Sequence, residues 1–224
     1  EVAEMGLFGL AIPEEYGGIG VNMEEEARVC LELGRTSPAF RSVFGTSIGI
    51  GSQGILMDGT EEQKQKYLPK IAIGECVASF ALTEPEAGSD AAHLKTTATR
   101  DGDQYVLNGT KRFITNAPSA DILTVMARTN AEIDGAGGVS SFIVERGSSG
   151  LSFGKPEKKM GQQGAHVCDV IFEDCRVPAE NLIGLQEGQG FKTAMKVLDR
   201  GRLHLAAVCV GFAQRALDEA LAYA

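Results

Sequence analysis

The hydrophobic periodicity of the chain changes twice, and these changes limit its possible folds more than any other feature. Apolar residues recur with helical spacing up to residue 76, and helical spacing returns from about Phe191 to the end. This pattern predicts an α+β chain in which helical regions flank a β-domain. The strand-like runs, rich in β-branched and aromatic residues, are Val77–Thr83, Thr96–Arg100, Tyr105–Leu107, Arg112–Ile114, Ile122–Ala127, Ser141–Val144 and Val167–Phe172.

Turn-forming residues separate these runs. Asp101-Gly102 follows one run, and glycine-rich segments occur at 134–138 and 147–150. Asn108-Gly109 lies between two apolar runs and predicts a β-hairpin there. Several short strands at this spacing favour a compact β-barrel or sandwich over a parallel sheet. No GxGxxG sequence opens a helix, so a dinucleotide would be held in another way.

The first 76 residues carry helix start signals. Residues 1–10 have the pattern of a helix interior, and Asn22 can cap a helix that runs to Gly34. The acidic run Glu24–Glu26 is most simply the solvated first turn of that helix. Ser37-Pro38 opens the next helix, which we expect to reach about Met57. Thr60 and Gln63 form a capping box for a helix over Glu61–Leu68.

One long helix is predicted from about Phe191 to the end. Arg202 lies within its apolar stripe and requires an anionic partner, which Asp199 can supply from one turn earlier. A plain helix ion pair is the alternative role for these two residues. The apolar members of the predicted stripe are Phe191, Met195, Leu198, Leu205, Cys209, Phe212 and Ala216.

Charge and hydropathy exclude two classes of partner. The formal net charge is -9 and no basic block occurs, so we expect no nucleic-acid groove. No run of 18 apolar residues occurs, which excludes a transmembrane helix of the usual kind. A local cationic pocket for a phosphate remains compatible with this composition.

The cysteines and histidines favour reduced thiols and no metal site. The 5 cysteines are scattered and none has CxxC spacing, which indicates buried thiols in a reducing compartment. His93, His166 and His204 lie far apart, and the latter two are expected to be structural. No targeting pattern opens the chain, and neither end has a helix cap. Both ends therefore suggest a piece of a longer polypeptide.

The stretch Phe80–Asp90 has the composition of a binding loop. An apolar strand leads to Thr83, breaks at Pro85 and closes with Gly88-Ser89-Asp90, which suits a turn or a helix N-cap. A hydroxyl at a strand end followed by glycine and serine amides can hold an anionic cofactor. A plain strand, loop and cap fits the same residues, and the pattern alone leaves both interpretations open.

Six motifs in order along the chain resemble those of the acyl-CoA dehydrogenases. The resemblance covers essentially the whole chain, so it does not depend on any single motif. The six segments are Leu10–Gly18, Gly59–Pro69, Thr83-Glu84-Pro85 with Gly88-Ser89-Asp90, Asn108–Lys111, Ile114-Thr115-Asn116, and Phe172–Pro178.

The resemblance implies a fold, an activity and partners. It implies a helical N-terminal domain over 1–76, an antiparallel β-barrel domain over 77–186 and the first helix of a C-terminal helical domain over 187–224. It also implies non-covalent FAD and dehydrogenation of an acyl-CoA thioester to the trans-2-enoyl-CoA, as in β-oxidation. Electrons would pass to an electron-transfer flavoprotein. The full-length protein would be a tetramer or dimer, in the bacterial cytoplasm or the mitochondrial matrix.

The resemblance also assigns roles to residues. Thr83 would hydrogen-bond the flavin, Thr115 would reach its N5 atom and Phe113 would lie against its face. The alternative role of the two threonines is to end a strand. The alternative role of Phe113 is that of a core aromatic. Ser89 would meet a phosphate and the CoA side of the cleft, while Asp199 and Arg202 would contact the CoA portion of the substrate. The predicted cofactor-binding residues are Phe80, Leu82, Thr83, Gly88, Ser89, Phe113, Ile114 and Thr115.

The catalytic base is not expected within residues 1–224. Some members of that family carry a catalytic glutamate at the position of Gly201, and others carry it further downstream. The chain has glycine at 201, so we predict a glutamate base beyond residue 224. An acyl-CoA oxidase on the same scaffold and a non-catalytic FAD- or CoA-binding fragment are the alternative functions.

Overall fold

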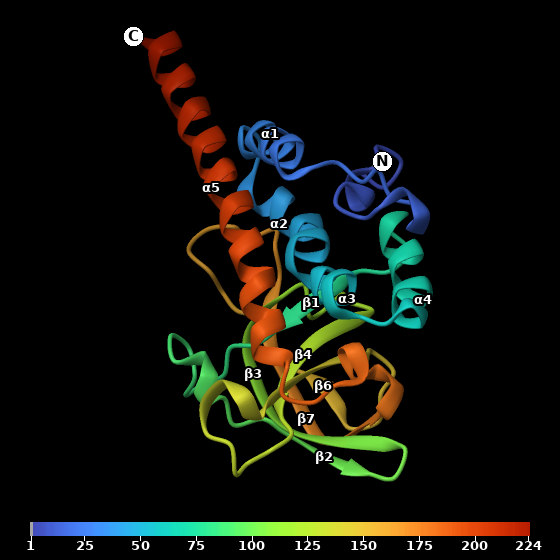
Figure 1. Ribbon diagram of the computed structural model, residues 1–224. Coiled ribbons are helices and arrows are strands. Elements are labelled where there is room, and N and C mark those ends of the chain that lie inside the picture. Colours follow the sequence, from blue (N-terminus) through green and yellow to red (C-terminus); the bar gives the residue numbers. More distant parts are fainter. Residues whose placement is uncertain (1) are drawn as a thin grey trace.

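A computed structural model describes residues 2–224 of the chain. Figure 1 shows a helical upper region, a curled sheet below it, and the long helix α5 (Gly190–Tyr223) that runs from the sheet past the helices. This architecture confirms the predicted α+β class, with a helical N-terminal region, a curled β-domain and a final helix.

The N-terminal region consists of short helices and turns. The predicted helix over residues 1–10 is wrong in the described part, where a single 3₁₀ turn covers Leu7–Gly9; residue 1 lies outside the described residues. Gly6 has a φ of 75°, which ends regular helix at that point. The other elements are the 3₁₀ turn Glu14–Tyr16, α1 (Met23–Gly34), α2 (Pro38–Thr46), the π-helical turn Ser47–Gly51, α3 (Gln53–Asp58) and α4 (Glu61–Ala72).

The helix starts predicted at Asn22, Ser37-Pro38 and Thr60 are confirmed. The Asn22 side chain accepts hydrogen bonds from the backbone amides of Glu24 and Glu25, at 2.9 and 3.1 Å. Thr60 accepts one from the Gln63 amide at 3.3 Å, and the Gln63 side chain accepts one from the Thr60 amide at 3.0 Å. These reciprocal bonds satisfy amides that have no partner within a helix.

The seven-stranded sheet has the order β1-β4-β2-β3-β7-β6, with β5 paired to β4. The expectation of a wholly antiparallel domain is wrong for two pairings, because β4 runs parallel to both β1 and β2. The chain leaves β1 and forms β2 and β3 before it returns as β4, and such a long connection permits parallel pairing. The strands are β1 (Ala78–Ala81), β2 (Thr97–Asp101), β3 (Gln104–Thr115), β4 (Ile122–Arg128), β5 (Val139–Glu145), β6 (Leu151–Phe153) and β7 (Val167–Pro178).

The hairpin predicted at Asn108-Gly109 is also wrong. The pair lies inside β3, at a register shift against β7, and the β2–β3 turn is at Gly102 instead. Gly109 has a φ of 147°, and a Cβ there would lie 2.6 Å from Thr96 Oγ1. The Asn108 amide donates to Asp174 on β7 at 3.1 Å. The pair therefore forms a β-bulge in a long strand.

The buried side of α5 differs from the predicted apolar stripe. Leu205 and Phe212 are 56% and 53% exposed, and Cys209 is exposed. The helix instead packs small residues against α1, because a Cβ on Gly211 would meet the Leu31 carbonyl oxygen at 1.9 Å. Large side chains do not fit such a close crossing. The buried residues of α5 are Gly190, Thr193, Ala194, Val197, His204, Val208 and Gly211.

The prediction that the Glu24–Glu26 run is solvated is wrong for Glu26. It is 2% exposed, and its carboxylate pairs with Arg200 and lies 2.6 Å from His204 Nε2, both on α5. Its neighbour Glu24 does lie at the surface, with a side chain that is 75% exposed. The acidic run therefore has one member that joins α1 to α5 and one that faces water.

The remaining connections are 3₁₀ turns at Ala91–His93, Gly135–Gly138, Ala179–Asn181 and Ile183–Leu185. Among residues 2–224 no helix combines the length and apolar character needed to cross a membrane. No group of His, Cys, Asp and Glu in this described part could hold a metal ion. All 5 cysteines are free thiols, and Cys209 is exposed while the others are buried.

Candidate functional site

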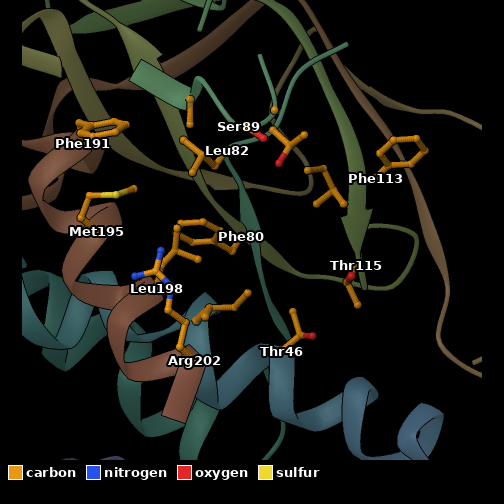
Figure 2. Close-up of a pocket in the computed structure, with 15 residues that line it drawn as sticks. Thr46, Phe80, Leu82, Ser89, Phe113, Thr115, Phe191, Met195, Leu198 and Arg202 are labelled. Atoms are coloured by element: carbon orange, nitrogen blue, oxygen red, sulfur yellow. The ribbon is translucent and has the colours of Figure 1, made fainter. Parts of the chain in front are cut away.

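A pocket of about 460 Å³ lies where β1 and β3 end against α5. Pockets for small molecules and cofactors commonly have this size and this mainly apolar lining. Figure 2 shows residues from α5 on one side and residues from the end of β3 on the other. The lining residues are Thr46, Ile50, Phe80, Leu82, Thr83, Gly88, Ser89, Ala91, Phe113, Ile114, Thr115, Phe191, Met195, Leu198 and Arg202.

Four residues of the lining carry hydroxyl groups. They are Thr46, Thr83, Ser89 and Thr115, and they come from α2, from the segment after β1 and from the end of β3. Each hydroxyl can donate one hydrogen bond and accept two. A ligand with polar groups along its edges can therefore be bound on several sides of this pocket.

The backbone is strained at Phe113. This residue has a φ of 58° and is 57% exposed, although it belongs to a strand. A bulky residue in the left-handed region is a conformational outlier, and such outliers concentrate at binding sites. The register of β3 against β7 shifts between Lys111 and Ile114, so the bulge there turns the Phe113 ring out of the sheet to the pocket.

Thr115 is fixed by the residues around it. The Ser79 hydroxyl on β1 donates to the Thr115 carbonyl oxygen at 2.6 Å. Asn116, which follows with a φ of 66°, donates from its side chain to the Val43 carbonyl on α2. These bonds hold the backbone of the strand end and leave the Thr115 hydroxyl for the pocket.

A buried ion pair supports the segment after β1. Lys111 Nζ lies 2.7 Å from Glu84 Oε1 and donates to the Leu82 carbonyl at 3.2 Å. Glu84 also accepts from the amides of Lys95 and Thr96, at 2.5 and 2.9 Å. Burial lowers the pKa of Lys111 to about 8, while the charge of Glu84 opposes that shift. The pair fixes Leu82 and Thr83 relative to β3.

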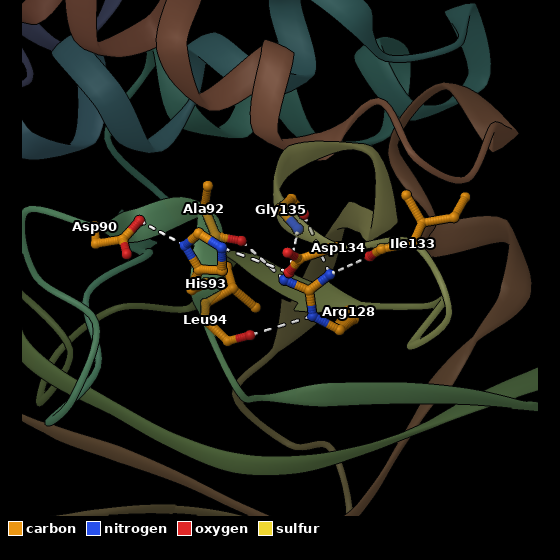
Figure 3. A network of polar contacts seen from close by, with 8 residues as sticks. All are labelled: Asp90, Ala92, His93, Leu94, Arg128, Ile133, Asp134 and Gly135. Carbon is orange, nitrogen blue, oxygen red and sulfur yellow. Dashed lines mark hydrogen bonds and ion pairs between the residues drawn. The ribbon is translucent and has the colours of Figure 1, made fainter.

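Arg128 connects the loop that follows Ser89 to a second loop (Figure 3). Its guanidinium donates to the carbonyls of Ala92 and Ile133, at 2.8 and 2.9 Å, with weaker bonds to Leu94 and Gly135. A single side chain thus satisfies carbonyls of both loops. Ser89 lies at the start of a loop that is fastened to the sheet a few residues later.

His93 lies on the outer side of this network. Its Nδ1 is 2.7 Å from Asp90 and its Nε2 is 3.5 Å from Asp134. The hydrogen bond and charge of Asp90 raise the pKa of His93 above the ordinary value of 6.5. The side chain is 48% exposed, so this network is a solvated contact between loops.

The structure brings together all eight residues predicted from the sequence to hold a cofactor. They line the same pocket, and Arg202 lines it as well. Asp199 does not line the pocket; it forms an exposed ion pair with Arg202. The eight are Phe80, Leu82, Thr83, Gly88, Ser89, Phe113, Ile114 and Thr115.

Six further lining residues were not predicted as site residues. Phe191, Met195 and Leu198 belong to the predicted apolar stripe of α5, so their position was a usable signal. Thr46 and Ile50 come from the segment that contains the π-helical turn, which is not recognisable from the sequence. No sequence feature marked Ala91 as a site residue. Within the described residues, the lining contains no carboxylate that could act as a base.

Three family models match consecutive parts of the chain. The acyl-CoA dehydrogenase N-terminal domain matches residues 1–75, the middle domain matches 79–175 and the C-terminal domain matches 188–224. Together these models account for nearly the whole chain, in the order that the fold shows.

Individual relatives agree with these models. The acryloyl-CoA reductase (NADH) of Anaerotignum propionicum is 45% identical over 100% of this chain, which spans 56% of that protein. A chain in the structure of the electron transferring flavoprotein of Acidaminococcus fermentans has a TM-score of 0.95 and 45% identity, over 99% of this chain and 58% of that one. The structure of the acyl-CoA dehydrogenase of Bacillus anthracis complexed with FAD has a TM-score of 0.94 and 43% identity. The match covers 100% of this chain and 38% of that one.

Proposed function

Because this chain belongs to the acyl-CoA dehydrogenase family, we propose that it forms the flavin- and thioester-binding part of an FAD-dependent acyl-CoA dehydrogenase. The reaction removes a proton from the α carbon and a hydride from the β carbon of an acyl-CoA thioester, and trans-2-enoyl-CoA is the product. The observation that carries this proposal is the set of four hydroxyl groups around one mainly apolar pocket.

The pocket residues fit a flavin. A flavin has a flat apolar ring system with polar edges, and the pocket has aromatic and aliphatic walls with hydroxyls at several points. Thr83 and Thr115 would bind the polar edges, Phe113 would cover a face, and Gly88 and Ser89 would lie against a phosphate. The Bacillus anthracis relative with the same fold binds FAD, which supports this assignment.

FAD, when bound, supplies the acceptor for the hydride that leaves the β carbon. The residues of this chain then have three tasks. The apolar side chains of Phe80, Met195 and Leu198 exclude water, and the hydroxyls of Thr83 and Thr115 stabilise negative charge at the ring edge. Arg202 would attract an anionic group of the CoA portion.

The α-proton requires a base that the pocket lining of this chain does not contain. A carboxylate with a raised pKa, shielded from water by the acyl chain, suits this step. The chain spans about half the length of the relatives above, so the proposed glutamate would lie beyond residue 224. Gly201 leaves the alternative position on α5 without a side chain.

We extend the proposal to partners and location. Electrons would pass to an electron-transfer flavoprotein, in line with the fold shared with a chain of the Acidaminococcus fermentans structure. The exposed apolar residues of α5, such as Leu205 and Phe212, would be covered in a full-length dimer or tetramer. Free thiols suit a reducing compartment, which would be the bacterial cytoplasm or the mitochondrial matrix. The pathway would be β-oxidation.

The test uses the full-length protein. We expect purified protein to show a flavin absorption spectrum, and anaerobic addition of an acyl-CoA thioester to bleach it. Rapid reoxidation of the reduced protein by oxygen would instead indicate an acyl-CoA oxidase. Folded protein that binds neither FAD nor a thioester would contradict the proposal, and binding of both without bleaching would indicate a non-catalytic scaffold.

A second candidate direction follows from similarity to the reductase of Anaerotignum propionicum. In this direction the same site would bind an enoyl-CoA thioester, whose β carbon would receive a hydride supplied by bound FAD in its reduced form and whose α carbon would receive a proton. Enoyl-CoA consumption that depends on NADH and a flavoprotein mediator would favour this direction. Thioester oxidation by an electron-transfer flavoprotein under the same conditions would favour dehydrogenation.

A further inference from the structure

Two loops meet beside the pocket, and the side chain of His93 lies between them (Figure 3). The first loop follows β1 and supplies Ser89 and Ala91 to the pocket lining. The second loop joins β4 to β5 and contains Asp134. His93 Nδ1 is 2.7 Å from Asp90 on the first loop, and its Nε2 is 3.5 Å from Asp134 on the second. One imidazole ring therefore contacts a carboxylate from each loop.

The second loop packs against the segment that leads into α5, and α5 forms another wall of the pocket. A Cβ on Gly188 would lie 2.7 Å from the Gly137 carbonyl oxygen, so the two backbones are in direct contact. The Gly188 amide also donates to Ser140 Oγ at 2.9 Å. Phe191 follows shortly after and lines the pocket from α5. A contact between the two loops thus joins two walls of the pocket.

Arg128 connects the same two loops in a way that does not depend on pH. Its guanidinium donates to backbone carbonyls of the first loop and to backbone carbonyls of the second. An arginine side chain keeps its charge at every pH at which a protein is folded. Arg128 therefore provides the permanent connection, and the contact through His93 is the one that can change.

The contact through His93 depends on the charge of its ring. A neutral imidazole has one N–H and can donate to only one carboxylate, whereas the imidazolium has two and can interact with both. The hydrogen bond and charge of Asp90, together with the charge of Asp134, raise the pKa of His93, and the nearby Lys95 opposes that shift. Arg128 is the charged group that reaches these loops from β4, and its guanidinium is bound to their carbonyls.

We propose that His93 is a positioning residue for the CoA thioester, because its imidazolium ties the loop that carries Ser89 to the loop packed against the start of α5. The inference rests on the proposed function and on the role expected for Ser89 at the CoA side of the cleft. When the ring loses its proton, the carboxylates of Asp90 and Asp134 lose their shared cation and repel each other. The first loop gains freedom, and a thioester must then order it on binding.

The experiment measures thioester binding as a function of pH. The dissociation constant of a trans-2-enoyl-CoA, such as crotonyl-CoA, is determined by calorimetry on the full-length flavin-loaded protein, below and above the pKa of His93. His93→Gln is measured in parallel, since an amide side chain does not change its charge. The ratio of the variant's constant to that of the wild type cancels the titration of the thioester phosphates. This ratio should be about two- to fivefold at low pH and should fall to about one at high pH.

Two further variants distinguish the loop contact from a direct attraction between the imidazolium and the anionic thioester. Asp134→Asn keeps the imidazolium but removes its partner on the second loop, so most of the tighter binding at low pH should be lost. Glu132→Gln removes the same charge from an exposed position on the same loop and should bind the thioester as the wild type does. Tighter binding in both variants would indicate a direct attraction and would overturn the proposal.

Kinetics supply a second readout. Since His93 does not line the pocket, its loss should raise KM at low pH and leave kcat unchanged. A binding ratio of one at every pH, or a lower kcat with an unchanged KM, would overturn the positioning role while leaving dehydrogenation intact. A folded, flavin-loaded protein that binds no CoA thioester would refute the proposed function and this inference together.

Discussion

Lys111 Nζ lies 2.7 Å from Glu84 Oε1, and both side chains are hidden from solvent. The two residues belong to separate sequence motifs, one after β1 and the other in the middle of β3. Their contact fixes the distance between Thr83, which follows β1, and the bulge at Phe113. The ion pair therefore shapes the pocket although it does not line it.

The loss of Lys111 should strongly destabilise the fold. Lys111→Met leaves the Glu84 carboxylate buried without its cation, and we expect the free energy of unfolding to fall by about 3–5 kcal/mol. Urea denaturation measures this change. The double variant with Glu84→Gln should lose less, because it buries no unpaired charge, whereas the exposed Lys158→Met should have little effect. A single variant as stable as the wild type would contradict the role of this pair.

Glu26 and Glu24 provide a matched comparison on one helix. Glu26→Gln removes the buried carboxylate that contacts Arg200 and His204, and we expect a loss of about 3–5 kcal/mol in unfolding free energy. Glu24→Gln breaks an exposed pair with Arg28 and should cost less than about 1 kcal/mol. Thermal or urea unfolding of both variants distinguishes them. Equal effects would contradict the assignment of Glu26 as the contact between α1 and α5.

Thr115→Val should lower turnover more than cofactor affinity in the full-length protein. A hydroxyl bond that strengthens as negative charge develops is worth about one factor of 10 in kcat. Steady-state kinetics and flavin titration separate the two effects. Thr99→Val on the exposed face of β2 is the control, since it makes the same change far from the pocket. If Thr115→Val has the kinetics of the wild type, Thr115 has only a structural role and the predicted contact with the flavin is contradicted.

Arg202→Ala should raise the apparent KM for acyl-CoA by about tenfold, because a charged hydrogen bond to the substrate is lost. Its pair with Asp199 is exposed, so the unfolding free energy should change by less than about 1 kcal/mol. Arg215→Ala removes a comparable exposed pair further along α5 and should leave KM unchanged. If Arg202→Ala binds the CoA substrate as tightly as the wild type does, the role of Arg202 is only to pair with Asp199.

His93 should titrate above its ordinary pKa of 6.5, because Asp90 stabilises the imidazolium. A raised pKa in the folded state means that the stabilisation is complete below about pH 6.5 and is lost as the pH rises through the folded value. The exposed position keeps the effect small. NMR titration of the ring protons measures the pKa, and Asp90→Asn should lower it. A pKa at or below 6.5 in the wild type would contradict the contact.

Local features were predictable wherever neighbours in the sequence produce the structure. The caps at Asn22 and Thr60 are closed by residues three positions further on, so the sequence contains both halves of each bond. The Asp199–Arg202 pair is likewise a helix-spacing contact. The motifs around Thr83 and Thr115 indicated a common site because they resemble a known family.

Predictions failed where a distant segment decides the outcome. Asn108-Gly109 has the composition of a hairpin, but β7 and Thr96 pack against it and make it a bulge. The apolar stripe of α5 was misassigned because α1 approaches too closely for large side chains at Gly211. Glu26 resembled a solvated residue until α5 brought Arg200 and His204 to it.

The sequence by itself determined the succession of helical and strand regions, the helix starts and, through its resemblance to a known family, most of the residues that line the site. These depend on hydrophobic period, capping and motif, which act over a few residues. The tertiary structure alone decided which charges are buried and which face of α5 is covered. Burial and charge pairing depend on which segments meet, and no short stretch of sequence contains that information.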